Sequence, residues 1–370
     1  MIKILFFIDE ITGGGAEKVL RTLVNNMHQS KFEITVQTMN PADPKEYLVP
    51  GIRYKAINRC KTPLGRKLFH YWIRLCAEMK WLYPLYIKDD YDIEAAYLEC
   101  GPTKIMAGST GRKARKLAWV HCDLAKKEGM AEQTEKLKRY YRAYDKVVCV
   151  SRNVRDSFVE MFGPEPEPVV LYNVNDETDI LHKAEAMDVP RTDGTELVAL
   201  GRLTRQKGFD RLIDACAALK GDGYRFRLRI LGEGPERKNL EKQIRDCGLG
   251  GYVELAGFVG NPYPYLKAAD LVVCSSRYEG FSTAATEALI LGKPIVTTPC
   301  TGMDELLGDS EYGLITEDST EGLYRGVKKL LADSRLREHY ARAAIVRGRA
   351  FSREKLVDET EKFFLELAAK

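Results

Sequence analysis

Short apolar runs recur along the chain and alternate with longer segments in which apolar residues have helical spacing. Helical spacing is clear, for example, at 15–29 and 132–144. The apolar runs are rich in β-branched and aromatic residues, and in the first half they predict strands at 2–8, 32–39, 51–57, 92–98, 116–121 and 146–151. Alternation of strands and helices predicts a parallel sheet that helices cover on both faces.

The pattern changes near residue 163. The stretch "GPEPEPVVLYNVNDETDI" is rich in proline and then polar, so we expect a linker that continues to about residue 193. The alternation then restarts and predicts strands at 196–202, 224–232, 252–258, 270–276, 293–298 and 313–316. We therefore expect two doubly wound, Rossmann-like α/β domains, residues 1–175 and 190–350, that face each other across a cleft. Ligands of such sheets bind at the carboxyl ends of the strands.

The composition agrees with this division. The 370 residues, of which 45% are hydrophobic and 30% charged, are enough for two domains with cores of their own. No apolar run approaches the length of a membrane span, and the start "MIKILFFIDE" predicts a buried strand instead of a signal peptide. The nine cysteines form no Cys-x-x-Cys pair, so we expect a cytoplasmic protein without a zinc site or a disulfide framework.

The net charge of +4 hides a basic excess in the first half of the chain. Such an excess suggests an anionic partner, although a solvated surface without a partner explains it equally well. Residues 65–88 mix basic residues with tryptophan and tyrosine, which is typical of a segment at a membrane surface. Peripheral contact with an anionic membrane and a helix packed on the sheet both remain open for this segment.

Three of the predicted strand ends carry glycine turns. In "DEITGGGAEKVL" a run of glycines opens a helix, where backbone N–H groups can approach an anion. It is not a dinucleotide fingerprint, because Lys18 stands where that fingerprint has glycine. In "LGRLTRQKGFD" the cations Arg202 and Lys207 flank a helix start, which suits a diphosphate. "LGEGPERKNL" is the third turn, and by itself it is an ordinary connector.

The fourth strand end is "RYEGFSTAATEALILGKPIV" at 277–296. Ser282 or Thr283 can cap a helix that Gly292 ends. Glu279 then lies in the loop and Glu287 about one turn into the helix. Either both carboxylates complement the helix dipole, or they bind a ligand at the strand ends.

Together these turns resemble the retaining GT-B glycosyltransferases of family 4. The likeness rests on Gly201-Arg202, Lys207-Gly208, Gly232-x-Gly234-Pro235 and the pair Glu279 and Glu287, and "GGGAEKVL" and "AWVHCDL" extend it over the first half. The resemblance implies a GT-B fold whose last helix, at 351–370, crosses back to the first domain. The amphipathic stretch "SREKLVDETEKFFLELAAK" suits this role.

The resemblance also implies roles for single residues. Arg202 and Lys207 are expected on the donor diphosphate and Glu287 on the ribose, while Glu279 and His121 are expected at the donor sugar as catalytic residues. Further donor contacts are expected from Gly14, Gly15, Gly234, Phe258, Gly280, Phe281, Ser282 and Thr283. Glu99 is a candidate acceptor residue, and a structural role for it stays open. We find no Asp-x-Asp motif and expect no metal and no cofactor beyond the donor.

The expected activity is retaining transfer of a hexose or N-acetylhexosamine from a nucleotide diphosphate sugar to a glycan or lipid-linked acceptor. UDP-sugars are the first expectation and GDP-mannose the second, and no nucleic-acid partner is expected. Front-face substitution is the expected mechanism, with a double displacement left open. A nucleotide-sugar epimerase and a catalytically silent relative are the alternatives.

Overall fold

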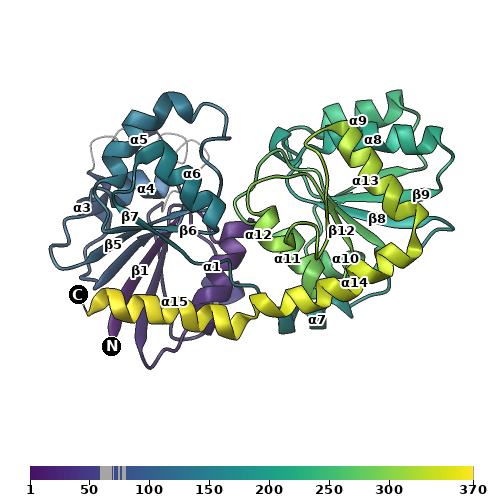
Figure 1. Ribbon diagram of the computed structural model, residues 1–370. Coiled ribbons are helices and arrows are strands. Elements are labelled where there is room, and N and C mark those ends of the chain that lie inside the picture. Colours follow the sequence, from purple (N-terminus) through teal and green to yellow (C-terminus); the bar gives the residue numbers. More distant parts are fainter. Residues whose placement is uncertain (59–68, 70, 74–75, 77–80, 370) are drawn as a thin grey trace. The chain divides into compact units, whose positions relative to one another are not determined.

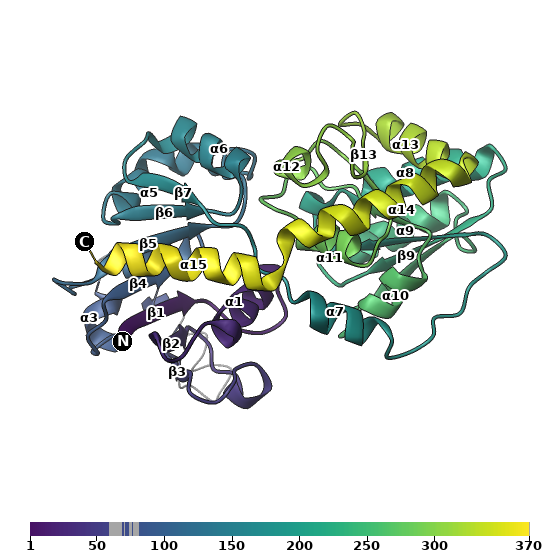
Figure 2. The same cartoon turned by 60° about the horizontal axis from the view of Figure 1, so that its bottom comes forward.

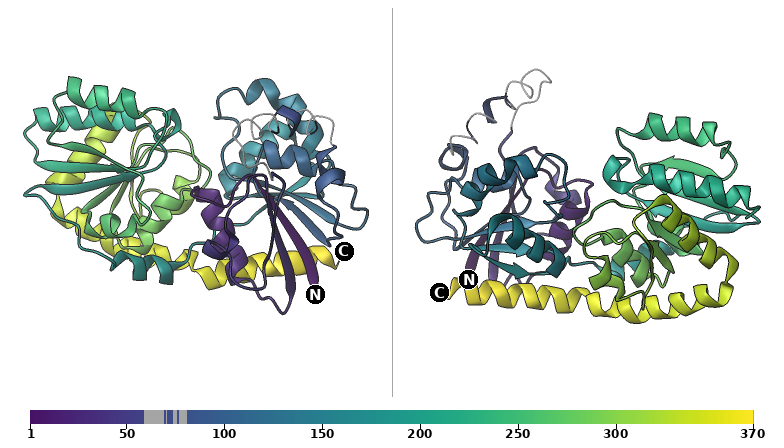
Figure 3. Two further views of the ribbon diagram at one scale, coloured as in Figure 1. Left: turned by 180° about the vertical axis from the view of Figure 1, so that it is seen from behind. Right: turned by 45° about the horizontal axis from the view of Figure 1, so that its top comes forward.

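The computed structural model describes residues 1–58, 69, 71–73, 76 and 81–369. They form two compact units, one of Met1–Val174 with Arg353–Lys370 and one of Asn175–Ser352. Each unit has a parallel sheet with helices on both faces (Figures 1 and 3). The predicted fold class, two doubly wound α/β sheets, is therefore confirmed.

The sheet of the first unit has the strand order β3-β2-β1-β4-β5-β6-β7, and all its neighbours pair in parallel. Its centre is apolar on both faces because helices cover both, and Ile4 to Ile8 are fully buried. The strands are β1 (Ile2–Ile8), β2 (Phe32–Thr38), β3 (Arg53–Ala56), β4 (Ile93–Ala96), β5 (Arg115–Val120), β6 (Lys146–Cys149) and β7 (Glu167–Val170).

The last helix of the chain belongs to the first unit and lies along its sheet (Figure 2). Phe364 is fully buried there, and its ring packs against those of Phe6, Phe32 and Trp119. The helices of this unit are α1 (Gly15–Asn26), α3 (Leu82–Tyr86), α4 (Gly101–Met106), α5 (Thr134–Tyr141), α6 (Arg152–Phe162) and α15 (Arg353–Ala368), with 3-10 turns η1 (Pro44–Glu46) and η2 (Ala131–Gln133).

The sheet of the second unit has the order β10-β9-β8-β11-β12-β13. Its strands are β8 (Thr195–Leu200), β9 (Phe226–Leu231), β10 (Val253–Gly257), β11 (Leu271–Cys274), β12 (Ile295–Thr297) and β13 (Leu314–Ile315). The helices are α7 (Glu177–Ala184), α8 (Phe209–Gly221), α9 (Arg237–Asp246), α10 (Tyr263–Ala268), α11 (Thr283–Ile290), α12 (Met303–Leu307), α13 (Thr320–Ala332) and α14 (Ser334–Gly348), with 3-10 turns η3 (Arg205–Lys207) and η4 (Arg349–Phe351).

The linker expected between 163 and 193 is partly wrong. Residues Glu167–Val170 form β7, which pairs with β6 at the edge of the first sheet. An edge strand tolerates Pro168, because a missing N–H is harmless on an unpaired side. Further on, Asp176 caps α7 by accepting a hydrogen bond from the Asp179 N–H at 3.1 Å. Helix α7 packs on α10 and α11 and is part of the second unit.

Within the described residues, none of the helices is both long and apolar enough to cross a membrane. The prediction for the segment 65–88 falls in part on residues that the structure does not describe. Of its basic residues, Arg66, Lys67, Arg74 and Lys80 lie outside the described residues, whereas Lys88 and the tryptophans and tyrosines of the segment lie within them.

Candidate active site

Close approaches of backbone shape the loops at the carboxyl edge of the second sheet. Gly208, which opens α8, has φ +62°, and a Cβ there would lie 2.1 Å from the Ser275 carbonyl oxygen. A Cβ on Gly234 would lie 2.4 Å from the Leu203 carbonyl oxygen. Only glycine fits either position. The loops after β8, β9 and β11 are thereby packed against one another.

Lys207 and Glu279 meet in this loop cluster. The Lys207 Nζ lies 2.5 Å from Glu279 Oε1, and the Ser276 hydroxyl donates to the same oxygen at 2.6 Å. The side chains are only 19% and 11% exposed. Burial alone would lower the pKa of the Lys207 ammonium, but the Glu279 carboxylate beside it raises that pKa above its ordinary value. The Lys207 ammonium therefore stays charged, and Oε2 is the Glu279 oxygen that neither Lys207 nor Ser276 contacts.

A second ion pair braces the same loop. The Arg277 guanidinium donates from both Nη atoms to the two oxygens of Asp210, at 2.8 and 2.6 Å. The Arg277 N–H also donates to the Gln206 carbonyl at 2.7 Å. Burial alone would raise the pKa of Asp210, but Arg277 holds it below the ordinary value. Because this bidentate pair ties the loop after β11 to the start of α8, it fixes the backbone on both sides of Lys207 and Glu279.

Helix α11 carries the second glutamate of the motif. The Ser282 hydroxyl caps the helix by accepting from the Ala285 N–H at 3.4 Å, as the sequence predicts. Glu287 is buried one turn in, and the Tyr263 hydroxyl donates to its Oε1 at 3.4 Å. Phe281 is buried against the ring of Phe351. The capping prediction is confirmed.

Arg202 and Phe258 lie at the surface of the same edge. Arg202 follows β8 and is exposed, without an ion-pair partner in the described part of the chain. Phe258 follows β10 and is 70% exposed. An exposed cation and an exposed aromatic ring thus lie at the ends of two strands of one sheet, which suits a ligand that combines anionic and flat apolar groups.

His121 follows β5 at the carboxyl edge of the first sheet. Its ring packs on Tyr97 with a centroid distance of 4.9 Å and forms a hydrogen bond with the Tyr97 backbone. Its Nε2 is buried and has no hydrogen-bond partner among the described residues. Burial lowers the pKa of His121 to about 4, despite the neighbouring Glu99. Since Nδ1 carries the proton that the Tyr97 carbonyl accepts, Nε2 is left as an acceptor for a hydroxyl group.

Glu99 lies directly behind His121. Its carboxylate accepts hydrogen bonds from the His121 N–H at 3.2 Å and from the Cys122 thiol at 3.0 Å. Lys127 Nζ lies 4.0 Å away. These contacts fix the backbone at the end of β5 and give Glu99 a structural part to play. Its expected role at the acceptor remains a prediction.

The glycine run begins α1 at the same edge. Gly14 is the N-cap residue, and a Cβ there would lie 1.8 Å from Glu17 Oε2, so the Glu17 side chain folds over Gly14. Asp9 directly follows β1; burial first, and then the carboxylates of Glu17, Glu10 and Glu99, raise its pKa to about 6. The donor contacts expected of Gly14 and Gly15 thus lie where a carboxylate sits, and they remain predictions.

One group of side chains has metal-ligand geometry within the described residues: His28, Asp358 and Glu361. Glu361 is buried, and it accepts from the His28 N–H at 2.6 Å and from Lys31 Nζ at 2.9 Å. Because the ammonium already compensates this carboxylate, we assign the cluster to anchoring α15 on the first unit.

Comparisons with known proteins identify the family. Residues 13–177 match the family model described as Glycosyltransferase Family 4, and residues 185–347 match that described as Glycosyl transferases group 1. A Campylobacter jejuni protein, N-acetylgalactosamine-N,N'-diacetylbacillosaminyl-diphospho-undecaprenol 4-alpha-N-acetylgalactosaminyltransferase, is 30% identical, over 99% of this chain and 100% of that protein. The chain is a family 4 glycosyltransferase.

Other relatives agree. The amylovoran biosynthesis glycosyltransferase AmsD of Erwinia amylovora is 25% identical to this glycosyltransferase over 93% of the chain and 94% of that protein. Among solved structures, Anabaena HepE in complex with UDP and glucose superposes with a TM-score of 0.78 at 20% identity, covering 98% and 99% of the two chains. Sucrose-phosphate synthase of Thermosynechococcus elongatus reaches 0.84 at 18% identity, covering 99% of each chain. The GT-B fold of this glycosyltransferase is thereby shown.

Sequence reasoning missed several residues of the glycosyltransferase that the structure brings to these edges. Arg277 stands directly before the glutamate motif and Asp210 directly after Gly208-Phe209, yet nothing in either motif indicates that they pair. Asp9, which follows the strand predicted at 2–8, was given no role. Burial raises its pKa most, followed by Glu17, Glu10 and Glu99, and of these carboxylates Glu99 is brought close only because β4 neighbours β1 in the sheet.

Proposed function

We propose that this glycosyltransferase moves a hexose or N-acetylhexosamine from a uridine diphosphate sugar to a glycan or lipid-linked acceptor, with retention of configuration at the anomeric carbon. The observation that carries the proposal is the buried pair of Lys207 and Glu279 in the loops at the sheet edge where the exposed Arg202 follows β8. These residues place one carboxylate, Glu279, and one cation without an ion-pair partner in the described residues, Arg202, at the strand ends of the second unit.

The charges at this edge of the sheet determine which residue binds each part of the donor. Glu279 compensates Lys207, so Arg202 is the cation whose charge is available for a diphosphate. The N–H groups at the start of α11 can meet a phosphate or a sugar oxygen, because they open a capped helix. Glu287 then receives the ribose hydroxyls, since a carboxylate accepts two hydroxyl hydrogens.

The chemistry requires that one C–O bond replaces another. The bond from the anomeric carbon to the diphosphate breaks, and a bond to the acceptor hydroxyl forms on the same face. The hydroxyl proton passes to the leaving diphosphate oxygen. Positive charge develops on the sugar, and the Oε2 atom of Glu279 stabilises that charge most in the transition state. The neutral His121 accepts a hydrogen bond from a sugar hydroxyl at Nε2 and moves no proton.

The comparisons support the donor and acceptor classes. HepE was solved with UDP-glucose, and Staphylococcus aureus TarM with UDP. The name of the Campylobacter jejuni relative describes transfer of N-acetylgalactosamine to a diphospho-undecaprenol-linked sugar. We therefore propose a cytoplasmic site of action on a nucleotide sugar, with neither a metal nor a cofactor required.

Calorimetric titration of UDP, with GDP as the competitor, tests the donor site. We expect UDP to bind and Arg202→Ala to weaken it about 10-fold or more, because a charge-assisted hydrogen bond contributes roughly 1.5–3 kcal/mol. Arg225→Ala is the matched control, an exposed arginine just before β9 at the opposite edge of the same sheet. Equal UDP affinity in both variants would rule out the diphosphate role, and a preference for GDP would correct the donor base.

The stereochemistry of the product tests the transfer itself. An α-linked donor sugar should give an α-linked product, which the proton NMR coupling constant at the new anomeric centre reports. A β-linked product would exclude retention and leave the family assignment intact.

A further inference from the structure

A hollow lies away from the candidate active site, at the amino ends of β4, β5 and β6. It measures about 750 Å³ and is lined by five basic side chains against two acidic ones. Its centre is the amino end of β5, whereas His121 follows the carboxyl end of that strand. Six residues separate the two ends, or about 20 Å, so the hollow is a separate feature.

The basic side chains of the hollow are poorly compensated. Arg112, Lys113 and Arg142 are exposed and have no ion-pair partner among the described residues. Of the two carboxylates, Asp145 lies 3.5 Å from the Arg115 guanidinium and accepts from the Lys116 N–H at 2.7 Å. Three cations therefore face solvent with their full charge. In solution, such an arrangement attracts anions.

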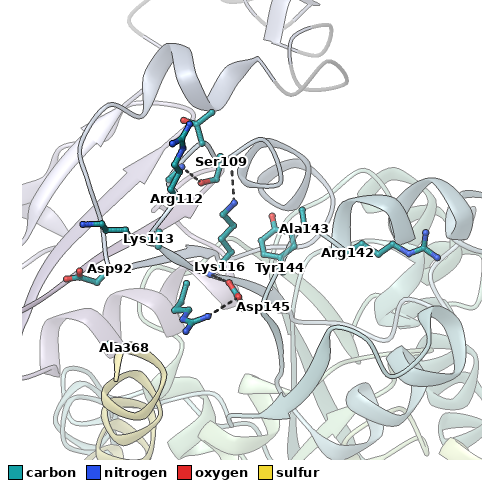
Figure 4. A pocket seen from close by; sticks show the side chains of 14 residues that line it. Asp92, Ser109, Arg112, Lys113, Lys116, Arg142, Ala143, Tyr144, Asp145 and Ala368 are labelled. Carbon is teal, nitrogen blue, oxygen red and sulfur yellow. Dashed lines mark hydrogen bonds and ion pairs between the residues drawn. The ribbon is translucent and has the colours of Figure 1, made fainter. Parts of the chain in front are cut away.

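The directions of these side chains exclude a single small anion as the ligand. Figure 4 shows Lys113 and Arg142 pointing to opposite sides of the hollow, with Arg112 above Lys116 between them. No phosphate could touch all three. A smaller hollow of about 370 Å³ shares Arg142 and adds Lys138. The charge is thus spread over an open area, which suits an anionic surface.

Exposed aromatic residues lie against and just before α3, the helix that contacts a lining residue of this hollow. Trp72 is 40% exposed and packs edge-on against Tyr86 of α3, and Trp81, just before α3, is 54% exposed. In Figures 1 and 2, α3 and the carboxyl-terminal end of α15, whose Ala368 lines the hollow, lie on the same side of the first unit. The link is direct, because the Tyr83 hydroxyl donates to Glu94, and Ser109, a lining residue, hydrogen-bonds both. Tryptophan beside lysine and arginine suits the headgroup layer of a bilayer.

We propose that the basic surface formed by Arg112, Lys113, Arg115, Lys116, Lys138 and Arg142 docks the first unit onto a membrane that carries anionic phospholipid headgroups. The exposed Trp72 and Trp81 enter the headgroup layer beside it. This docking goes beyond the proposed transfer reaction and uses none of its residues. It therefore predicts that vesicle binding and donor binding can be separated by substitution.

Vesicle sedimentation tests the proposal on the full chain. We expect binding to vesicles of phosphatidylglycerol and phosphatidylcholine, little binding to phosphatidylcholine alone, and loss of binding as salt shortens the Debye length from about 30 to about 8 Å. The variant Arg112→Glu/Lys113→Glu/Arg142→Glu should bind at least about 100-fold more weakly, at about fivefold per cation removed. The matched control is Lys238→Glu/Arg335→Glu/Arg342→Glu, which changes the net charge equally on exposed residues of the second unit.

The outcomes separate the alternatives. Weak binding of the first variant together with unchanged binding of the control supports the proposal, provided that both variants keep the UDP affinity of the wild type. Equal binding of the two variants, or no binding to either kind of vesicle, overturns it. Calorimetric binding of tripolyphosphate at the hollow without vesicle binding also overturns it and identifies a site for a soluble phosphate. If the wild-type protein does not bind UDP, the transfer proposal is overturned and the docking proposal is not.

Discussion

The ion pair of Lys207 and Glu279 predicts that a donor-site substitution will also destabilise the protein. Lys207→Met removes the ammonium but keeps most of the apolar stem. It leaves the Glu279 carboxylate almost buried, with only the Ser276 hydroxyl donating to it at 2.6 Å. Glu279→Gln in the same background removes that orphaned charge. The double variant should therefore be more stable than Lys207→Met alone.

The magnitude follows from the burial of the pair. Removing one partner of a buried ion pair costs about 3–5 kcal/mol. We expect the lower end, about 3 kcal/mol, because the side chains keep 19% and 11% exposure and Ser276 remains in place. For a unit of this size, about 3 kcal/mol lowers Tm by roughly 6–12 °C. The double variant should recover about 2 kcal/mol of this loss.

The distribution of tryptophan makes the assay specific. Trp72, Trp81 and Trp119 are the three tryptophans of the chain, and all lie in the first unit. Calorimetry or far-UV circular dichroism reports both units, whereas tryptophan fluorescence reports the first. We expect Lys207→Met to lower the unfolding temperature of the second unit, which calorimetry detects and tryptophan fluorescence does not.

Additivity would refute this reasoning. If the losses in Lys207→Met and Glu279→Gln add in the double variant to within about 0.5 kcal/mol, the two groups do not interact. If only the unfolding temperature measured by fluorescence decreases, the substitution destabilises the first unit, which would also contradict the reasoning.

Three further predictions concern single positions. Gly208→Ala should cost on the order of 2–3 kcal/mol in thermal unfolding, since its Cβ meets the Ser275 carbonyl and φ is +62°, whereas Gly221→Ala, with open space around it, should not destabilise. Asp9→Asn should stabilise the protein in thermal unfolding by on the order of 1–2 kcal/mol at pH 7.5, and this gain should vanish below about pH 4. The reason is that the folded-state pKa of Asp9 is raised to about 6, so ionisation of Asp9 lowers stability as the pH rises above the unfolded-state pKa. A gain that persists at low pH would contradict this. Phe364→Ala should cost about 3–5 kcal/mol and alter tryptophan fluorescence; unchanged urea unfolding by fluorescence would contradict the packing of α15.

The strands could be predicted because both faces of each sheet are covered. Their apolar runs are therefore continuous, as in β1, and stand out against the helices. Strand β7 and helix α7 escaped detection for the opposite reason. Proline interrupts the edge strand, and α7 is short and depends on the side-chain cap of Asp176 and on packing against α10 and α11. The pairing of β7 with β6 and the packing of α7 are contacts between distant parts of the chain, so a single sequence does not reveal them.

The residues of the candidate site could be named from the sequence, but their partners could not. Lys207 and Glu279 are 72 positions apart and meet because β8 and β11 are neighbours in the sheet. A strand order of this kind is a property of the whole fold. The same holds for His121, whose unpartnered Nε2 becomes apparent only once the ring is buried against Tyr97.

The position of α15 has a consequence for how the protein is made. A ribosome releases β1 (Ile2–Ile8) long before Phe364, yet these segments share one core through Phe6. The sheet of the first unit therefore keeps an apolar face uncovered throughout synthesis of the second unit, which needs nothing that follows Ser352. Although amino-terminal domains usually complete their folding first, here the second unit is complete before the first. A nascent chain stalled or truncated just before α15 would present that uncovered face to chaperones and proteases.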